Sequence, residues 1–197
     1  MAGIVDELMG TLGGADGGLD GVLAGVLGDR AATPEGQRAT GLGLEAILGG
    51  LARNAQSPEG AASLRAALER HEDGGALGDL GSLATPERAA DGGKILGHVF
   101  GQDQQAVAQN LAGKSGLDVS SIMKLLPALA PVVMGMLGQK SREGGLDAGG
   151  LGGMLQSEAG GFDLGDVIGM VTGGGDSRGG AGGGLLKKLL GMFSGRR

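Results

Sequence analysis

Glycine is the feature that most limits how this chain can fold. It occupies 47 of the 197 positions, and a glycine inside a helix costs about 1 kcal/mol relative to alanine. Its distribution is uneven, because residues 33–139 hold 18 glycines in 107 positions whereas the two flanks together hold 29 in 90. We therefore predict a folded domain over 33–139, between a glycine-rich N-terminal segment (1–32) and a glycine-rich C-terminal tail (140–197).

The central domain is predicted to consist of helices. One helix-start signal, a hydroxyl residue followed by Pro-Glu, occurs three times and begins at Thr33, Ser57 and Thr85. The hydroxyl can cap the first turn, the proline fits that turn, and the glutamate lies at the positive end of the helix dipole. Apolar residues then recur every three or four positions, and no stretch alternates with a period of two. The sequence therefore predicts an all-α fold, a small multi-helix bundle.

The most apolar stretch of the chain follows Asp118, whose side chain suits an N-cap. Apolar residues cover nearly all sides of the helix predicted after it, which is typical of the central helix of a bundle. We expect Leu126 and Leu129 to be buried there. Pro127 and Pro131 each remove a backbone donor, and they predict a kink.

Charge and cysteine content exclude several functional classes. The net charge of −6 is the wrong sign for a general binder of phosphate backbones. Without cysteine the chain has no disulfide, thiolate nucleophile or cysteine-ligated zinc. Asp6 and Glu7 lie where a secretory signal would be basic and then apolar. The longest uncharged apolar-rich run, residues 125–139, is shorter than the ~20 residues of a spanning helix. We expect a soluble cytoplasmic protein.

A helix-turn-helix-like corner is predicted between residues 106–112 and the helix that begins after Asp118, with the turn at Gly116-Leu117. A helix that reads DNA carries Arg, Lys, Asn or Gln on its exposed face. This second helix offers only Lys124 before a run of leucine, proline and valine. We therefore interpret the corner as a packing arrangement, and nucleic acid as a disfavoured partner.

Several runs of this sequence resemble the bacterial YidB-like domain, over about residues 35–140. They are Asp91 to His98, Val107 to Ala112, Gly116 to Ser121 and Leu125 to Pro131, with looser similarity at Gly3 to Leu8 and Leu185 to Phe193. The resemblance implies an all-α fold with a homeodomain-like element. That family has no established activity, so the resemblance assigns no catalytic residue.

The residues themselves favour no enzyme. His71 and His98 lie in different predicted elements, without partners at the spacing of a metal site or a catalytic triad. The acidic pairs in glycine-rich surroundings lack the alternating oxygen ligands of a calcium loop. The glycine clusters at 173–175 and 182–184 follow no strand and contain no Gly-Lys-Ser/Thr step. We predict no catalytic, cofactor-binding or metal-binding residue, and no small-molecule substrate.

The two ends of the chain carry the same apolar pattern. Five apolar residues at the offsets i, i+1, i+4, i+5 and i+8 form each of two segments: Ile4, Val5, Leu8, Met9 and Leu12, and Leu185, Leu186, Leu189, Leu190 and Phe193. Each pattern predicts a one-sided helix of about 8–12 residues, too short to be stable alone in water. We therefore predict these ten residues as interaction residues that need a surface to dock on.

Three docking surfaces are open at this point: the chain's own bundle, neighbouring copies, and a membrane. Several weak segments on glycine-rich tethers would add their affinities through multivalency. The function that we favour is a non-enzymatic structural protein that self-associates into a homo-oligomer. The alternatives are a peripheral membrane or partner-binding module that uses residues 185–197, where the charge is basic, and thirdly DNA binding through the helix-turn-helix-like corner.

Overall fold

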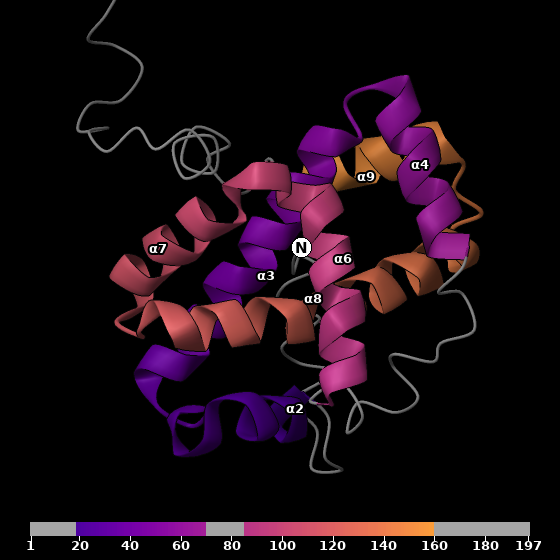
Figure 1. Cartoon of the computed structure of the whole chain (residues 1–197). Helices are drawn as coiled ribbons and strands as arrows, with labels where there is room; N and C mark the ends of the chain where they lie inside the picture. Colours follow the sequence, from indigo (N-terminus) through magenta and orange to yellow (C-terminus); the bar gives the residue numbers. More distant parts are fainter. Residues whose placement is uncertain (1–18, 70–84, 160–197) are drawn as a thin grey trace, which may run out of the picture.

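The computed structural model describes residues 19–69 and 85–159 (Figure 1). All regular elements in these two ranges are helical, and no strand occurs within them, which confirms the predicted all-α bundle. The α-helices are α2 (Leu19–Leu27), α3 (Pro34–Asn54), α4 (Pro58–Glu69), α6 (Pro86–Phe100), α7 (Gln104–Ser115), α8 (Val119–Glu143) and α9 (Ala148–Ala159). Two 3-10 turns, η1 (Gly28–Arg30) and η3 (Gly101–Asp103), follow α2 and α6.

The three repeated start signals each begin a helix at the proline. The Thr33 hydroxyl accepts a hydrogen bond from Gly36 N (3.1 Å), and the Ser57 hydroxyl accepts one from Gly60 N (3.0 Å). Thr85 is the N-cap residue of α6 but makes no side-chain cap hydrogen bond. The predicted helix starts are therefore confirmed, and in α3 and α4 the hydroxyl satisfies a backbone donor that the first turn leaves unpaired.

The centre of the bundle is α8, as its all-round apolar sequence predicts. It packs against α6 most extensively, and also against α3, α2, α7 and α4. The Leu126 and Leu129 side chains have no exposed surface, which confirms their predicted burial. The helix continues through Pro127 and Pro131 to Glu143, and the kink at these prolines stays a prediction.

The helices α6 and α8 cross (Figure 1), and Gly92 of α6 lies at the crossing. A Cβ at Gly92 would clash with the carbonyl oxygen of Pro127 in α8. Pro131, four residues further along α8, has no N–H to donate to that oxygen. The glycine therefore lets the two backbones approach at a carbonyl that lacks its usual intrahelical bond.

Parts of both glycine-rich flanks belong to the packed core. In α2, Leu19, Val22, Leu23 and Leu27 are buried, and the helix lies against α8. Leu151 and Leu155 of α9 are buried in the same core, where α9 packs on α3 and α4. The division at residues 32 and 139 rests on glycine counts, whereas in the structure the core extends across both positions.

Among the described helices, α8 alone has the length and hydropathy of a helix that could cross a membrane. It has 25 residues, and its most apolar 18-residue window has a mean hydropathy of 1.6. In the bundle 61% of that window is buried, and the same properties are typical of the core helix of a bundle. The absence of a membrane-spanning segment therefore stays a prediction.

Candidate functional site

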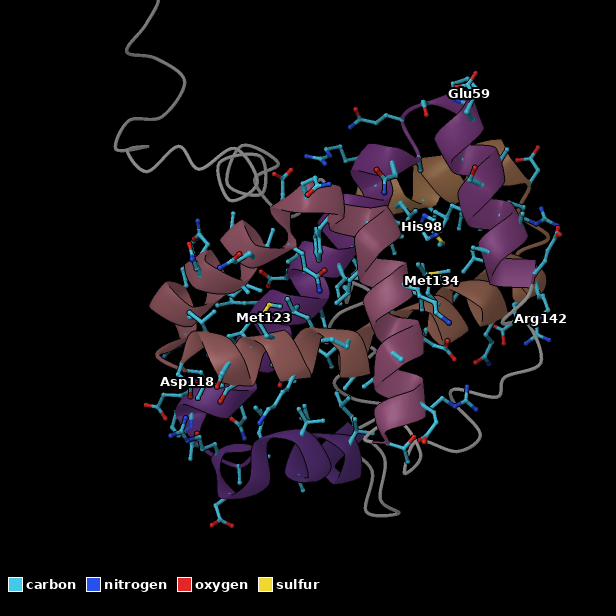
Figure 2. All side chains as sticks on the ribbon, viewed as in Figure 1. Glu59, His98, Asp118, Met123, Met134 and Arg142 are labelled. Atoms are coloured by element: carbon cyan, nitrogen blue, oxygen red, sulfur yellow. The ribbon has the colours of Figure 1, made fainter. Side chains whose placement is uncertain are left out.

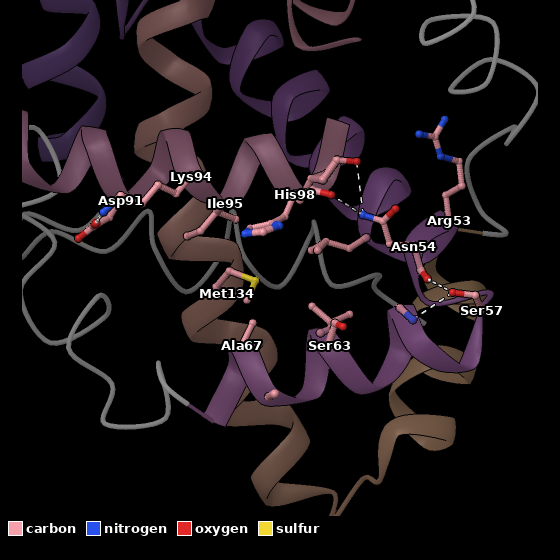
Figure 3. A pocket seen from close by; sticks show the side chains of 15 residues that line it. Arg53, Asn54, Ser57, Ser63, Ala67, Asp91, Lys94, Ile95, His98 and Met134 are labelled. Carbon is pink, nitrogen blue, oxygen red and sulfur yellow. Dashed lines mark hydrogen bonds and ion pairs between the residues drawn. The ribbon is translucent and has the colours of Figure 1, made fainter. Parts of the chain in front are cut away.

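The ten predicted interaction residues, in residues 4–12 and 185–193, lie outside the described residues. What the structure does describe is the surface of the bundle on which such segments could dock. The hollow on this surface that we consider lies between α4 and α6, and we call it the α4–α6 groove (Figure 3). Its volume is about 890 Å³, within the range of roughly 300–1,000 Å³ that is typical of ligand-binding clefts.

The groove has an apolar floor and a polar rim. The floor is formed by buried side chains from three helices, among them Leu51 of α3, Val99 of α6 and Met134 of α8. Small residues of α4 form one wall, with Ser63 and Ala67 labelled in Figure 3. The opposite wall is formed by α6, with Asp91, Lys94 and His98 exposed and Ile95 half-buried. An apolar centre inside a polar rim is the usual composition of a protein–protein interface.

One end of the groove is closed by hydrogen bonds among three helix ends. The side-chain amide of Asn54, the last residue of α3, donates to the His98 carbonyl oxygen (2.9 Å) and to the Val99 carbonyl oxygen (3.4 Å) at the end of α6. These carbonyls belong to the last turn of α6, where the intrahelical donors run out. The hydroxyl of Ser57, which also lines the groove, caps the first turn of α4. Asn54 therefore fixes where α6 ends relative to the turn between α3 and α4.

Among the described helices, α4 packs mainly on helices other than α6, and the groove lies between these two. The main neighbour of α4 is α9, and α4 also contacts α8 and α3. Arg65 strengthens this placement, since its Nη1 atom donates to the carbonyl oxygen of Leu146 (2.6 Å), in the turn before α9. The apolar side of α4 faces the core with Ala61, Leu64 and Leu68, as the spacing of these residues predicts. The small residues next to that side then face the groove.

The rim of the groove carries an ion pair and a histidine on α6. Lys94 Nζ lies 2.9 Å from Asp91 Oδ1, one turn apart on α6, and both side chains are largely exposed. His98 is exposed on the same side of α6, and His71 lies outside the described residues. Within residues 19–69 and 85–159, no three His, Cys, Asp or Glu residues are grouped as metal ligands would be. The arrangement can bind an apolar face and orient it with polar contacts at the rim.

A second polar cluster lies at the corner between α7 and α8 (Figure 2). Gly116 ends α7 with a left-handed φ of 89°, and Asp118 caps α8 by accepting from Ser121 N (2.9 Å). The Ser120 hydroxyl (2.6 Å), both donors of Ser121, and Arg30 Nη1 (2.6 Å) all bond the Asp118 carboxylate. Hydrogen bonds from Ser120 above all, then Ser121 and Arg30, hold the pKa of Asp118 well below its ordinary value.

The cluster at this corner connects two parts of the bundle. Arg30, which follows α2, is paired with Asp118 and so connects the N-terminal part of the bundle to the start of α8. The exposed side of the first turns of α8 presents Val119, Met123 and Lys124. A negative carboxylate beside one lysine offers little attraction to phosphates.

Sequence reasoning missed the groove, although it identified the helices around it. The lining residues come from α3, α4, α6 and α8, so no local pattern connects them. The sequence does contain one signal, the recurrence of the small residues Gly60, Ser63 and Ala67 along one side of α4. This signal is weak, because small residues on a helix can equally face solvent or a close neighbour.

Comparison with known proteins gives one match. The family model described as a bacterial protein of unknown function (DUF937) matches residues 23–140. No curated protein and no solved structure matches the chain. The matched range includes most of α2 and all of α3 to α7, and it ends within α8, so it contains both walls of the groove.

Proposed function

The chain belongs to the DUF937 family of bacterial proteins of unknown function, and from its surfaces we propose that it is a non-enzymatic structural protein that self-associates. Its short amphipathic terminal segments, residues 4–12 and 185–193, dock on helical surfaces of the bundle or of neighbouring copies. The observation that carries this proposal is the α4–α6 groove, which has an apolar floor and polar rims. Amphipathic helices bind such grooves by laying their apolar face on the floor.

The helix α2 supports this proposal, because it is a segment of the same type in a docked position. Val22, Leu23, Val26 and Leu27 have the first four offsets of the terminal pattern. Val22 is fully buried and Leu23 is 6% exposed, and the helix lies against α8. A nine-residue helix in this chain therefore obtains its stability from a surface that covers its apolar side.

The two ends also carry opposite charges at equivalent positions. Asp6 and Glu7 occupy the offsets i+2 and i+3 of the first segment, and Lys187 and Lys188 occupy the same offsets of the second. Opposite charges at equivalent positions favour contacts between the two ends over contacts between like ends. This pattern supports association between copies, with the first segment of one copy near the second segment of another.

The energies indicate reversible docking. Burying four leucines and one phenylalanine contributes about 1.5–3 kcal/mol per side chain, whereas ordering nine residues costs about 1–2 kcal/mol each in backbone entropy. The two totals nearly cancel. Docking of residues 185–193 should therefore respond to protein concentration and to added partners.

Deletion of residues 185–197 tests the proposal. Size-exclusion chromatography with light scattering, at protein concentrations that approach the millimolar range, should show a smaller assembly, while circular dichroism shows that the bundle stays helical. A chain that ends at Ser194 is the matched control, because it keeps the apolar face and loses Arg196 and Arg197. An oligomer distribution and a melting curve that both stay the same after the deletion would refute docking.

A second function is favoured by the charge of the C-terminal end. No acidic residue follows Asp176, whereas Lys187, Lys188, Arg196 and Arg197 do. A basic amphipathic helix binds anionic lipid surfaces. This alternative, a peripheral membrane or partner-binding module at the cytoplasmic side, predicts binding to anionic vesicles that is lost both in the deletion and in the chain that ends at Ser194.

Two further proposals concern the α7–α8 corner. DNA binding is the third alternative, and Lys124 on the exposed side of α8 is the residue that it would use. The finer family assignment, a YidB-like domain with a homeodomain-like element, is also our proposal. Its support is the sequence resemblance together with the short turn of residues 116–118 between α7 and α8.

A further inference from the structure

We infer that residues 185–193 dock in the α4–α6 groove of their own copy. The inference rests on the proposed function and goes further, since it names the groove as the receiving surface and one segment as its occupant. It is carried by the composition of the groove, by the position from which the C-terminal tail leaves the bundle, and by the length of that tail.

The groove offers what the segment needs along one side. Its floor is apolar and is made by buried side chains of the core. Its α4 wall has Ser63 and Ala67, whose small side chains leave room for leucines. The apolar face of residues 185–193 consists of four leucines and one phenylalanine, and Lys187 and Lys188 lie on the other side. Docking would therefore bury the apolar face and leave both lysines in water.

The tail follows a helix that packs on one wall of the groove. The last described helix, α9, packs directly on α4, which forms one wall. In Figure 1 α9 and α4 lie together at one end of the bundle. Residues 160–184, 25 positions of which 12 are glycine, separate the end of α9 from Leu185. A glycine-rich chain of that length has a root-mean-square reach of about 28 Å, whereas the 12 residues of α4 span about 18 Å.

The N-terminal segment fits this groove less well. Only residues 13–18 separate Leu12 from the start of α2. The α2 helix packs on α8, and Figure 1 shows it at the opposite end of the bundle from α4. A link of six residues extends to at most about 25 Å. Residues 185–193 can therefore reach the groove through their long linker, whereas the short linker of residues 4–12 does not give them the same access.

The tether also decides between the chain's own groove and that of a neighbour. A flexible linker that can span two sites gives an effective concentration in the millimolar range. A second copy competes only when the protein itself approaches that concentration. In dilute solution the groove is therefore filled by the tail of the same copy, and exchange of tails between copies begins as the concentration rises.

Thiol labelling tests the inference, because the chain has no cysteine of its own. Ser63→Cys places one thiol in the groove, and Ala62→Cys places one on the exposed outer side of α4 as the matched control. Each is made in the full-length chain, with and without Leu189→Glu and Leu190→Glu in the tail. Lys187→Glu controls for a change of charge that leaves the apolar face intact.

We expect maleimide to label Ser63→Cys at least about fivefold more slowly when the tail is intact, which corresponds to a docking constant about fivefold below the millimolar effective concentration. The double glutamate variant should remove this protection, and Lys187→Glu should not. Ala62→Cys should be labelled equally fast in all backgrounds. The protection should not change with protein concentration in the micromolar range.

Three results would overturn the inference. Equal labelling of Ser63→Cys with either tail means that residues 185–193 do not cover the groove. Protection that survives the two glutamates assigns the groove to another occupant, such as residues 4–12. Protection that increases with protein concentration assigns it to the tail of a second copy, and this result leaves the proposed function standing. The proposed function fails separately, if deletion of 185–197 changes neither the assembly state nor the melting curve.

Discussion

Gly92→Ala tests the close crossing of α6 and α8, on which the orientation of the groove wall depends. The added Cβ would clash with the Pro127 carbonyl oxygen and would lie 2.6 Å from the carbonyl carbon and 2.9 Å from Cα of the same residue. Ordinary contacts begin at 3.4 Å, so the helices must separate by about 1.5 Å in a close-packed interior. The obstacle is backbone, which cannot rotate away as a side chain can.

The expected free-energy change follows from two opposing terms. Overpacking of a core costs about 1–3 kcal/mol, and we expect the upper part of this range because the whole helix must move. Replacing glycine by alanine inside a helix stabilises it by about 1 kcal/mol. The net prediction is a loss of about 2 kcal/mol in the free energy of unfolding.

Gly93→Ala is the matched control for this prediction. The next residue of the same helix has nothing within 4 Å of its Cβ position, so only the helix-propensity term applies. That variant should therefore be more stable than the wild type by up to about 1 kcal/mol. Urea unfolding followed by circular dichroism measures both changes. Equal stability of the two alanine variants would refute the reasoning, since the crossing would then have room for a methyl group.

Two further predictions concern the core and the α7–α8 corner. Leu129→Ala should lower the free energy of unfolding by about 2–5 kcal/mol, because the side chain is fully buried. Met123→Ala is the control, since that side chain is 39% exposed, and it should change the free energy of unfolding by less than about 0.5 kcal/mol. Equal melting temperatures for the two variants would contradict the burial of Leu129. Asp118→Ala should lower the free energy of unfolding at neutral pH. The pKa of Asp118 is lowered in the folded state, so its charged carboxylate stabilises the fold at pH values above the ordinary aspartate pKa of 3.8. The difference from the wild type in urea midpoint should shrink as the pH falls below that value, and a difference that does not change with pH would exclude the carboxylate as its source.

Local rules were sufficient for the helix boundaries. The starts at Pro34, Pro58 and Pro86 follow from a hydroxyl, a proline and an acid within one turn, and these interactions involve only neighbouring residues. The αL end of α7 at Gly116 is equally local. The central position of α8 followed from composition, because a helix that is apolar on all sides has to be surrounded.

The extent of the core was not predictable from glycine counts. α9 contains four glycines in 12 residues, yet Leu151 and Leu155 are buried. Packing of an apolar side against α3 and α4 compensates for the helix propensity that glycine lacks, and this compensation depends on neighbours that are distant in the sequence. A boundary drawn from the number of glycines in each segment therefore leaves out glycine-rich helices that pack into the core.

By itself the sequence determined the all-α class, the helix starts and the identity of the central helix, because each depends on interactions within a turn or on the periodicity of one segment. Only the tertiary structure decided that α4 packs on α9 and not on α6, and that Asn54 fixes the end of α6. These contacts join residues 44 or more positions apart, between which no local preference acts. The groove between α4 and α6 is the consequence, and it exists only once the helices are assembled.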